Sequence, residues 1–232
     1  MSRGMDSLIL LTIDARAEEA PGRSTPPTQD AAPDPHVASV RDRLWALLMR
    51  VADAGLRRWY GVREFTDDPS CLLRLALAPA PREVTLSDGT RIETGETVIM
   101  LHIWNEQVPR FRLGGPDLRW AIDVRRRLRR SFWALAKHLE EDPAWTQVRG
   151  IHACVVFGSR RRREQIRRAA EHFGFELIGD GAPAKGWHEW GEDFLIWAFA
   201  RAFNPGALRR SPFWRDRTEL WISREALLRR YL

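Results

Sequence analysis

Apolar and polar positions recur along the chain with two different periods, which predict its helices and strands. Steps of three and four residues predict helices, and runs of apolar residues between turn signals predict strands. The predicted helices cover residues 37–60, 117–141, 160–173 and 224–231. The predicted strands cover residues 71–78, 97–104, 148–157, 175–178 and 219–222. Asp88-Gly89 predicts a hairpin with arms at 84–86 and 91–93, because this pair tolerates the positive φ angles of a tight turn.

This order of elements predicts an α+β fold. A split β-α-β-like mixed sheet with helices packed mainly on one face fits it best. The Trp-rich part after residue 180, with a further helix expected over 190–203, is predicted to be a helical C-terminal extension.

The first residues have a different character from the rest. Residues 14–36 are rich in Pro, Ala and acidic residues and hold no large apolar residue, so they cannot bury enough surface to fold. We therefore expect a disordered tail over 1–36 and a single domain over 37–232. Leu8–Ile13 is either a short strand or a docking segment, and the sequence does not decide between them.

Charge follows the same division. Residues 1–39 carry three Arg and six acidic residues, whereas the whole chain has a net charge of +6, so the remainder holds +9. Only Lys137 and Lys185 are lysines. The Arg-rich body predicts attraction to polyanions or anionic lipid, although Arg-favouring codon usage explains the composition equally well.

Cysteine usage and hydropathy bear on the compartment. Cys71 and Cys154 lie in apolar runs, which favours buried reduced thiols over a disulfide. No run of about 18 apolar residues predicts a transmembrane helix, and the sequence remains compatible with peripheral membrane contact. We expect a cytoplasmic protein.

Histidines mark the first candidate site. On a strand, His102, Trp104 and Glu106 share one face, and Asn105 faces the other way. If the strands of His102 and His152 are neighbours, the two imidazoles come close and, with Asn105 and Glu106, form a candidate acid–base site. A half-buried structural histidine is the plainer interpretation of each. No HExxH or CxxC spacing is present, so no metal set is assigned and any cofactor is unknown.

A second candidate is an anion site where a strand meets a helix. The helix start offers free backbone N–H groups and a positive dipole end beside four arginines. Its residues are Gly158, Ser159, Arg160, Arg161, Arg162 and Arg163. The spacing is not that of a P-loop, and a solvated helix face is the alternative.

The helix over 117–141 carries an arginine stripe, Arg125–Arg130. Nucleic-acid binding is one interpretation, but no recognised DNA- or RNA-binding motif accompanies it, and a solvated helix face explains it as well.

Tryptophan is the other unusual residue, with eleven copies. Trp45, Trp133 and Trp197 fall on apolar helix faces and are predicted core residues. Trp104 and the Trp187-His188 pair are candidates to line a ligand site, because indole rings stack on sugars and bases.

The "LSDG" hairpin at Leu86–Gly89, the Gly95-Glu96 turn and a strand ending in His102 and Asn105 resemble the YkoP-like domain of bacteria. The resemblance covers about residues 40–180, and Glu96 stands where Asp is expected. The family has no established activity. Similar domains occur alone or attached to polysaccharide deacetylases and glycosyltransferases, so the resemblance implies work on cell-envelope polysaccharide.

Three functions follow as hypotheses. The first is an accessory module that binds an anionic ligand, such as a sugar- or lipid-linked phosphate or another glycan precursor. The second is a hydrolase or transferase that uses His102, Asn105 and His152. The third is nucleic-acid binding through the Arg-rich helices.

Overall fold

The computed structural model describes residues 8–9, 40–104, 106–109, 117–157, 160–179, 198 and 216–232. Its helical elements are α1 (Val40–Tyr60), α2 (Leu118–Glu141), the short 3-10 helix η1 (Pro143–Trp145), α3 (Arg160–Phe173) and α5 (Arg224–Tyr231). Its strands are β1 (Leu8–Ile9), β2 (Leu73–Pro79), β3 (Val84–Thr85), β4 (Arg91–Ile92), β5 (Thr97–Ile103), β6 (Gly150–Phe157), β7 (Glu176–Ile178) and β8 (Asp216–Ser223).

Five strands form a mixed sheet in the order β2-β5-β6-β8-β7. β5 and β6 are parallel neighbours joined by α2, and β8 runs antiparallel between β6 and β7, which α3 joins. This is a split β-α-β arrangement in an α+β fold. β1 pairs in parallel with Cys154 and Val155 of β6, beyond the stretch of β6 that pairs with β5. The start of the Leu8–Ile13 segment is therefore a strand.

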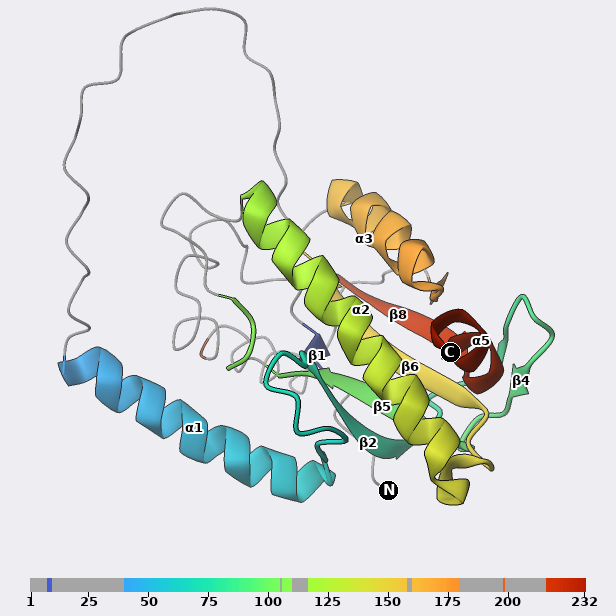
Figure 1. Ribbon diagram of the computed structural model, residues 1–232, viewed down its shortest axis with the longest axis horizontal. Helices are drawn as coiled ribbons and strands as arrows, with labels where there is room; N and C mark the ends of the chain where they lie inside the picture. The colour runs from blue at the N-terminus through green and yellow to red at the C-terminus, as the bar shows by residue number, and fades with distance from the viewer. Residues whose placement is uncertain are drawn as a thin grey trace, which may run out of the picture.

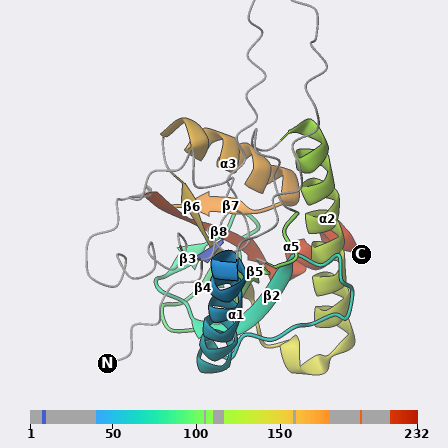
Figure 2. The same ribbon diagram turned by 90° about the vertical axis from the view of Figure 1, so that its left-hand side faces the viewer.

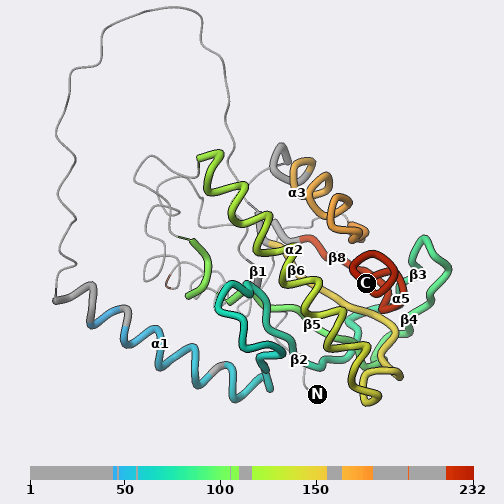
Figure 3. Tube along the Cα trace, in the orientation of Figure 1, coloured from blue at the N-terminus to red at the C-terminus, as the bar shows by residue number. Residues whose placement is uncertain are grey.

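The main core lies between the sheet and three helices. α2 crosses the sheet, with α3 and α5 beside it (Figure 1). Leu128, Phe132 and Leu135 of α2 are buried against residues such as Ile99 and Ile151 of the sheet. α5 lies between α3 and the β3–β4 hairpin (Figure 3), where the Tyr231 hydroxyl donates a hydrogen bond to the Phe173 carbonyl.

Local signals set most of the element boundaries. Asp117 accepts a hydrogen bond from the Trp120 amide at 2.8 Å and caps α2, and Ser223 caps α5 in the same way. Gly174 ends α3 with a φ of +88°, a conformation that residues with a Cβ rarely adopt. The predicted starts and stops of these helices are confirmed.

Three sequence expectations need correction. The end of the chain is not an appended extension, because β8 is an interior strand and α5 packs on the core. The remainder of the Trp-rich part after residue 180 lies outside the described residues, apart from Ala198. Trp133 is an exposed residue of α2 rather than a core residue. Trp45 is only partly buried, while Trp197 and the expected disordered tail fall outside the described residues, apart from β1.

Candidate functional site

One face of the sheet packs against the core, and the opposite face holds the candidate site residues. Ile99, Leu101 and Ile103 of β5 point into the core beneath α2, so Met100 and His102 point to the opposite face. His152 lies on that same opposite face, because Met100 is its partner across the parallel pair of β5 and β6. The two strands are neighbours, which is the condition that the sequence analysis set for this site. The two histidines are nevertheless not cross-strand partners.

Arg74 of β2 organises the part of this face around His102, its partner on the next strand. Its side chain is only 4 % exposed. Its guanidinium lies 3.1 Å from Glu64, 3.5 Å from Asp53 and 3.6 Å from Glu106. The remaining contact is with Trp104, whose ring centroid is 4.0 Å from the guanidinium carbon. We call Asp53, Glu64, Arg74, Trp104 and Glu106 the Arg74 cluster.

Two carboxyl groups of this cluster approach the same nitrogen. Asp53 Oδ2 and Glu106 Oε2 both lie near Nη1 of Arg74. Burial, followed by the charge and hydrogen bond of Glu106, raises the pKa of Asp53. The neighbouring Glu106 therefore favours the protonated form of Asp53.

His102 is the cross-strand partner of Arg74, and its imidazole is neutral at neutral pH. Burial lowers the pKa of His102 to about 4, and the nearby charge of Arg74 lowers it further in the same direction. At neutral pH the imidazole therefore carries one ring proton and one lone pair.

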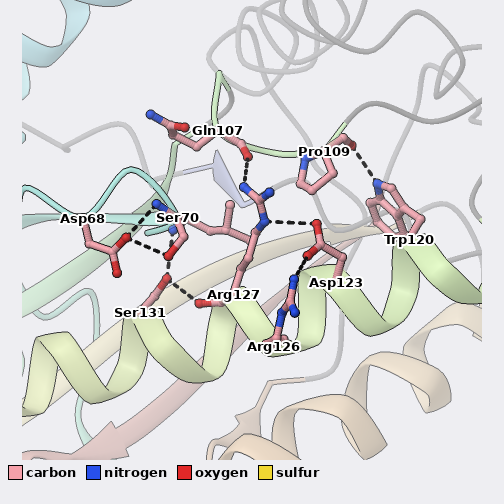
Figure 4. A network of polar contacts seen from close by, with 10 residues as sticks. Asp68, Ser70, Gln107, Pro109, Trp120, Asp123, Arg126, Arg127 and Ser131 are labelled. Atoms are coloured by element: carbon pink, nitrogen blue, oxygen red, sulfur yellow. Dashed lines mark hydrogen bonds and ion pairs between the residues drawn. The ribbon is translucent and has the colours of Figure 1, made fainter.

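α2 fixes the segment that carries Glu106 (Figure 4). The Trp120 indole donates a hydrogen bond to the Pro109 carbonyl at 2.6 Å, and Arg127 donates to the Gln107 carbonyl at 3.5 Å. Asp123 holds Arg127 in place at 3.0 Å. The chain directly after Glu106 is thus anchored to α2 at Gln107 and Pro109.

His152 lies in a separate environment. Its ring stacks on Trp221 with centroids 4.3 Å apart, and its Nε2 lies 3.9 Å from Glu219 Oε2. Glu219 also accepts hydrogen bonds from Arg82 and from the Trp221 indole. Burial lowers the pKa of His152 to about 4, although the charge of Glu219 opposes this shift. This contact set is that of a neutral structural histidine packed between strand and hairpin.

The arginine stripe of α2 is divided into paired and unpaired members. Arg126 and Arg127 bind Asp123, and Arg130 binds Asp68. Within the part of the chain that the structure describes, no carboxylate pairs with Arg125 or Arg129. These two approach His172 of α3, whose pKa is lowered by burial and then by Arg125, Arg230 and Arg129. We call Arg125, Arg129, His172 and Arg230 the basic patch.

Several predicted site residues are not placed. Asn105, Gly158, Ser159, Trp187 and His188 lie outside the described residues. Arg160–Arg163 form the first turn of α3, as predicted, and the positions of their side chains are not described. The anion site at this helix start stays a prediction.

The described residues also bear on metal ligands and on membrane-spanning helices. Among them, no group of three or more His, Cys, Asp or Glu side chains is placed to hold a metal ion. Cys71 and Cys154 are both buried and form no disulfide with each other, as expected. Within the same residues, no helix combines the length and apolar character needed to cross a bilayer.

Comparison with known families agrees with the fold boundaries. The model of the YkoP domain matches residues 43–231. The chain belongs to the YkoP domain family. The match continues past residue 180, where the resemblance was expected to end, and it includes β8 and α5. No curated protein and no solved structure matches the chain.

Sequence reasoning missed three members of the Arg74 cluster in this YkoP domain, namely Asp53, Glu64 and Arg74. Asp53 lies on α1, for which the sequence analysis considered only the spacing of apolar residues. Arg74 lies on β2, which was predicted only as a buried strand. A usable signal was present. Arg74 interrupts the apolar run Cys71–Ala78, and an arginine buried in a strand requires carboxylate partners.

Proposed function

We propose that this YkoP domain is a hydrolase or transferase that acts on a glycan precursor through general acid–base catalysis at the Arg74 cluster. The observation that carries the proposal is the approach of Asp53 and Glu106 to one nitrogen of a buried arginine, beside a neutral His102. The glycan class follows from the family association with envelope polysaccharide.

The proposed chemistry needs one protonated and one ionised carboxyl. The protonated member donates its proton to the leaving oxygen or nitrogen, and the ionised member accepts a proton from the attacking water or hydroxyl. The pair then holds the same number of protons as before. Burial raises the pKa of Asp53, which favours its protonated form, and the charge of Arg74 opposes this shift.

Replacement of Glu106 by Gln tests this proposal. The variant keeps the shape of the side chain and removes its charge, so turnover should fall at least about a hundredfold if Glu106 transfers a proton. The assay is release of acetate, sugar or nitrophenol from acetylated chitooligosaccharides and nitrophenyl glycosides. Glu64→Gln is the matched control, because Glu64 contacts the same arginine from a more exposed position, and it should change turnover only a few-fold. Full activity in Glu106→Gln would reject the site.

A second function is favoured by the basic patch, namely binding of an anionic ligand. Three helices bring Arg125, Arg129, His172 and Arg230 together, and the two α2 arginines have no carboxylate partner among the described residues. A phosphate offers several acceptor oxygens to such a set of donors.

The α2 stripe supplies its own control for this second function. Arg125→Gln with Arg129→Gln should weaken binding of inorganic pyrophosphate at least about a hundredfold in calorimetry, because each of the two charge-assisted hydrogen bonds contributes roughly 1.5–3 kcal/mol. Arg126→Gln with Arg130→Gln removes the same charge from ion-paired positions and should have little effect. Equal losses of pyrophosphate affinity in the two double variants would mean that the ligand responds to overall positive charge and not to the basic patch. Tight salt-dependent binding of an oligonucleotide, lost only in the first pair, would assign the patch to nucleic acid instead.

A further inference from the structure

α1 presents an apolar face to solvent. Leu44, Leu47, Leu48 and Val51 are 55–67 % exposed, and Trp59 is 84 % exposed. Steps of three and four residues place these five side chains on one face of the helix. Exposed apolar surfaces of this kind mark interaction sites, because burial elsewhere is the default for large apolar side chains.

The opposite face fixes how α1 is oriented. Met49 is buried, and Asp53 forms ion pairs with Arg57 of the same helix and with Arg74 of the sheet. The Trp45 indole donates a hydrogen bond to the Ala198 carbonyl at 3.4 Å. α1 stands apart from α2 and α5 on the outside of the molecule (Figures 1 and 2). Rotation of the helix would break these contacts, so the apolar face remains turned outward.

The charges beside the apolar face identify the partner. Arg50 and Arg58 are both exposed. At about 100° per residue, Arg50 lies about 60° beyond Leu47 on one flank of the stripe, and Arg58 lies between Leu47 and Val51. No carboxylate among the described residues pairs with either of them. Trp59 ends the stripe, and tryptophan favours the boundary between lipid headgroups and acyl chains.

A second copy of the chain is a poorer fit to this face. Two α1 helices packed face to face about a two-fold axis would cover Arg58 of each copy, which lies within the stripe and has no carboxylate partner among the described residues. An anionic surface has the opposite effect. It neutralises both arginines while the apolar side chains leave water.

We propose that α1 docks on an anionic lipid bilayer, with Leu44, Leu47, Leu48, Val51 and Trp59 inserted at the interface and Arg50 and Arg58 against lipid phosphates. The helix lies in the membrane plane and does not cross it. This docking site is independent of the proposed catalysis. It would, however, hold Asp53 and the Arg74 cluster on the protein side of the docked helix.

Vesicle flotation of the full-length protein tests the proposal. Binding is expected to vesicles of phosphatidylcholine with about 30 % phosphatidylglycerol and to be weak with phosphatidylcholine alone. Leu47→Glu with Val51→Glu should lower the partition coefficient at least about tenfold. Arg50→Gln with Arg58→Gln should lower it about fivefold per arginine, because each cation near an anionic surface contributes about 1 kcal/mol.

Leu118→Glu with Ile122→Glu is the matched control, since these are also exposed aliphatic residues on a helix. It should leave vesicle binding unchanged, and the melting temperature of every variant should match that of the wild type. Equal loss in both Glu pairs, or no flotation of the wild type, would overturn the proposal. Sedimentation velocity separates the competing partner: a wild-type dimer that Leu47→Glu with Val51→Glu dissociates, without vesicle binding, would assign the face to a second copy.

Discussion

Replacement of Arg74 by methionine should lower the free energy of unfolding by about 3 kcal/mol at pH 7. Removing one partner of a buried ion pair costs roughly 3–5 kcal/mol because it leaves an uncompensated charge. The lower end applies here, since Glu64 is 45 % exposed and can regain water. Asp53 and Glu106 are more buried and would face each other without a cation. Chemical denaturation of the variant and the wild type gives the difference.

Two comparisons make this prediction specific. Arg130→Met removes an arginine from an exposed ion pair with Asp68 and should cost less than about 1 kcal/mol. The deficit of Arg74→Met should also shrink between pH 7 and pH 5. The pKa of Asp53 is already raised with Arg74 present, and loss of the Arg74 charge, which lowers it, would raise it further, so the folded variant would take up protons that the unfolded chain does not. A deficit below 1 kcal/mol, or one that grows as the pH falls, would contradict the charge argument.

The sequence predicted those parts of the fold that local signals determine. α2 and α3 begin and end where Asp117 and Gly174 indicate, because a cap and a positive φ act within one turn. The order of the strands was beyond such signals. β8 comes last in the chain and was predicted as a short strand, yet it lies between β6 and β7 and pairs with β6 along its whole length.

The residues of the candidate site also differ in whether a local sequence pattern could predict them. A period of two was sufficient to place His102 and Glu106 on one side of the chain. It could not supply Asp53, which lies on α1 and reaches Arg74 only when that helix docks on β2. The sequence could not predict that the apolar face of α1 is exposed. An apolar stripe predicts burial whether or not another part of the same chain covers it.

Acidification from pH 7 to pH 5 should destabilise the folded domain by about 2 kcal/mol for each of its two buried histidines. Burial lowers the pKa values of both His102 and His152 to about 4, against 6.5 in the unfolded chain. The unfolded state therefore binds more protons than the folded state between these values. Stability is complete above pH 6.5 and declines as the pH falls towards 4.

His152→Phe isolates one of the two contributions. Phenylalanine preserves the stacking on Trp221, and among the described residues neither ring nitrogen of His152 has a hydrogen-bond partner to lose. The variant should equal the wild type at pH 7 and exceed its unfolding free energy by about 2 kcal/mol at pH 5. Comparing variant with wild type at each pH cancels the opposing contribution of Asp53, whose pKa is raised. An identical pH dependence in both proteins would mean that His152 is protonated in the folded state, and the ion pair with Glu219 would then replace the neutral stacked ring as its role.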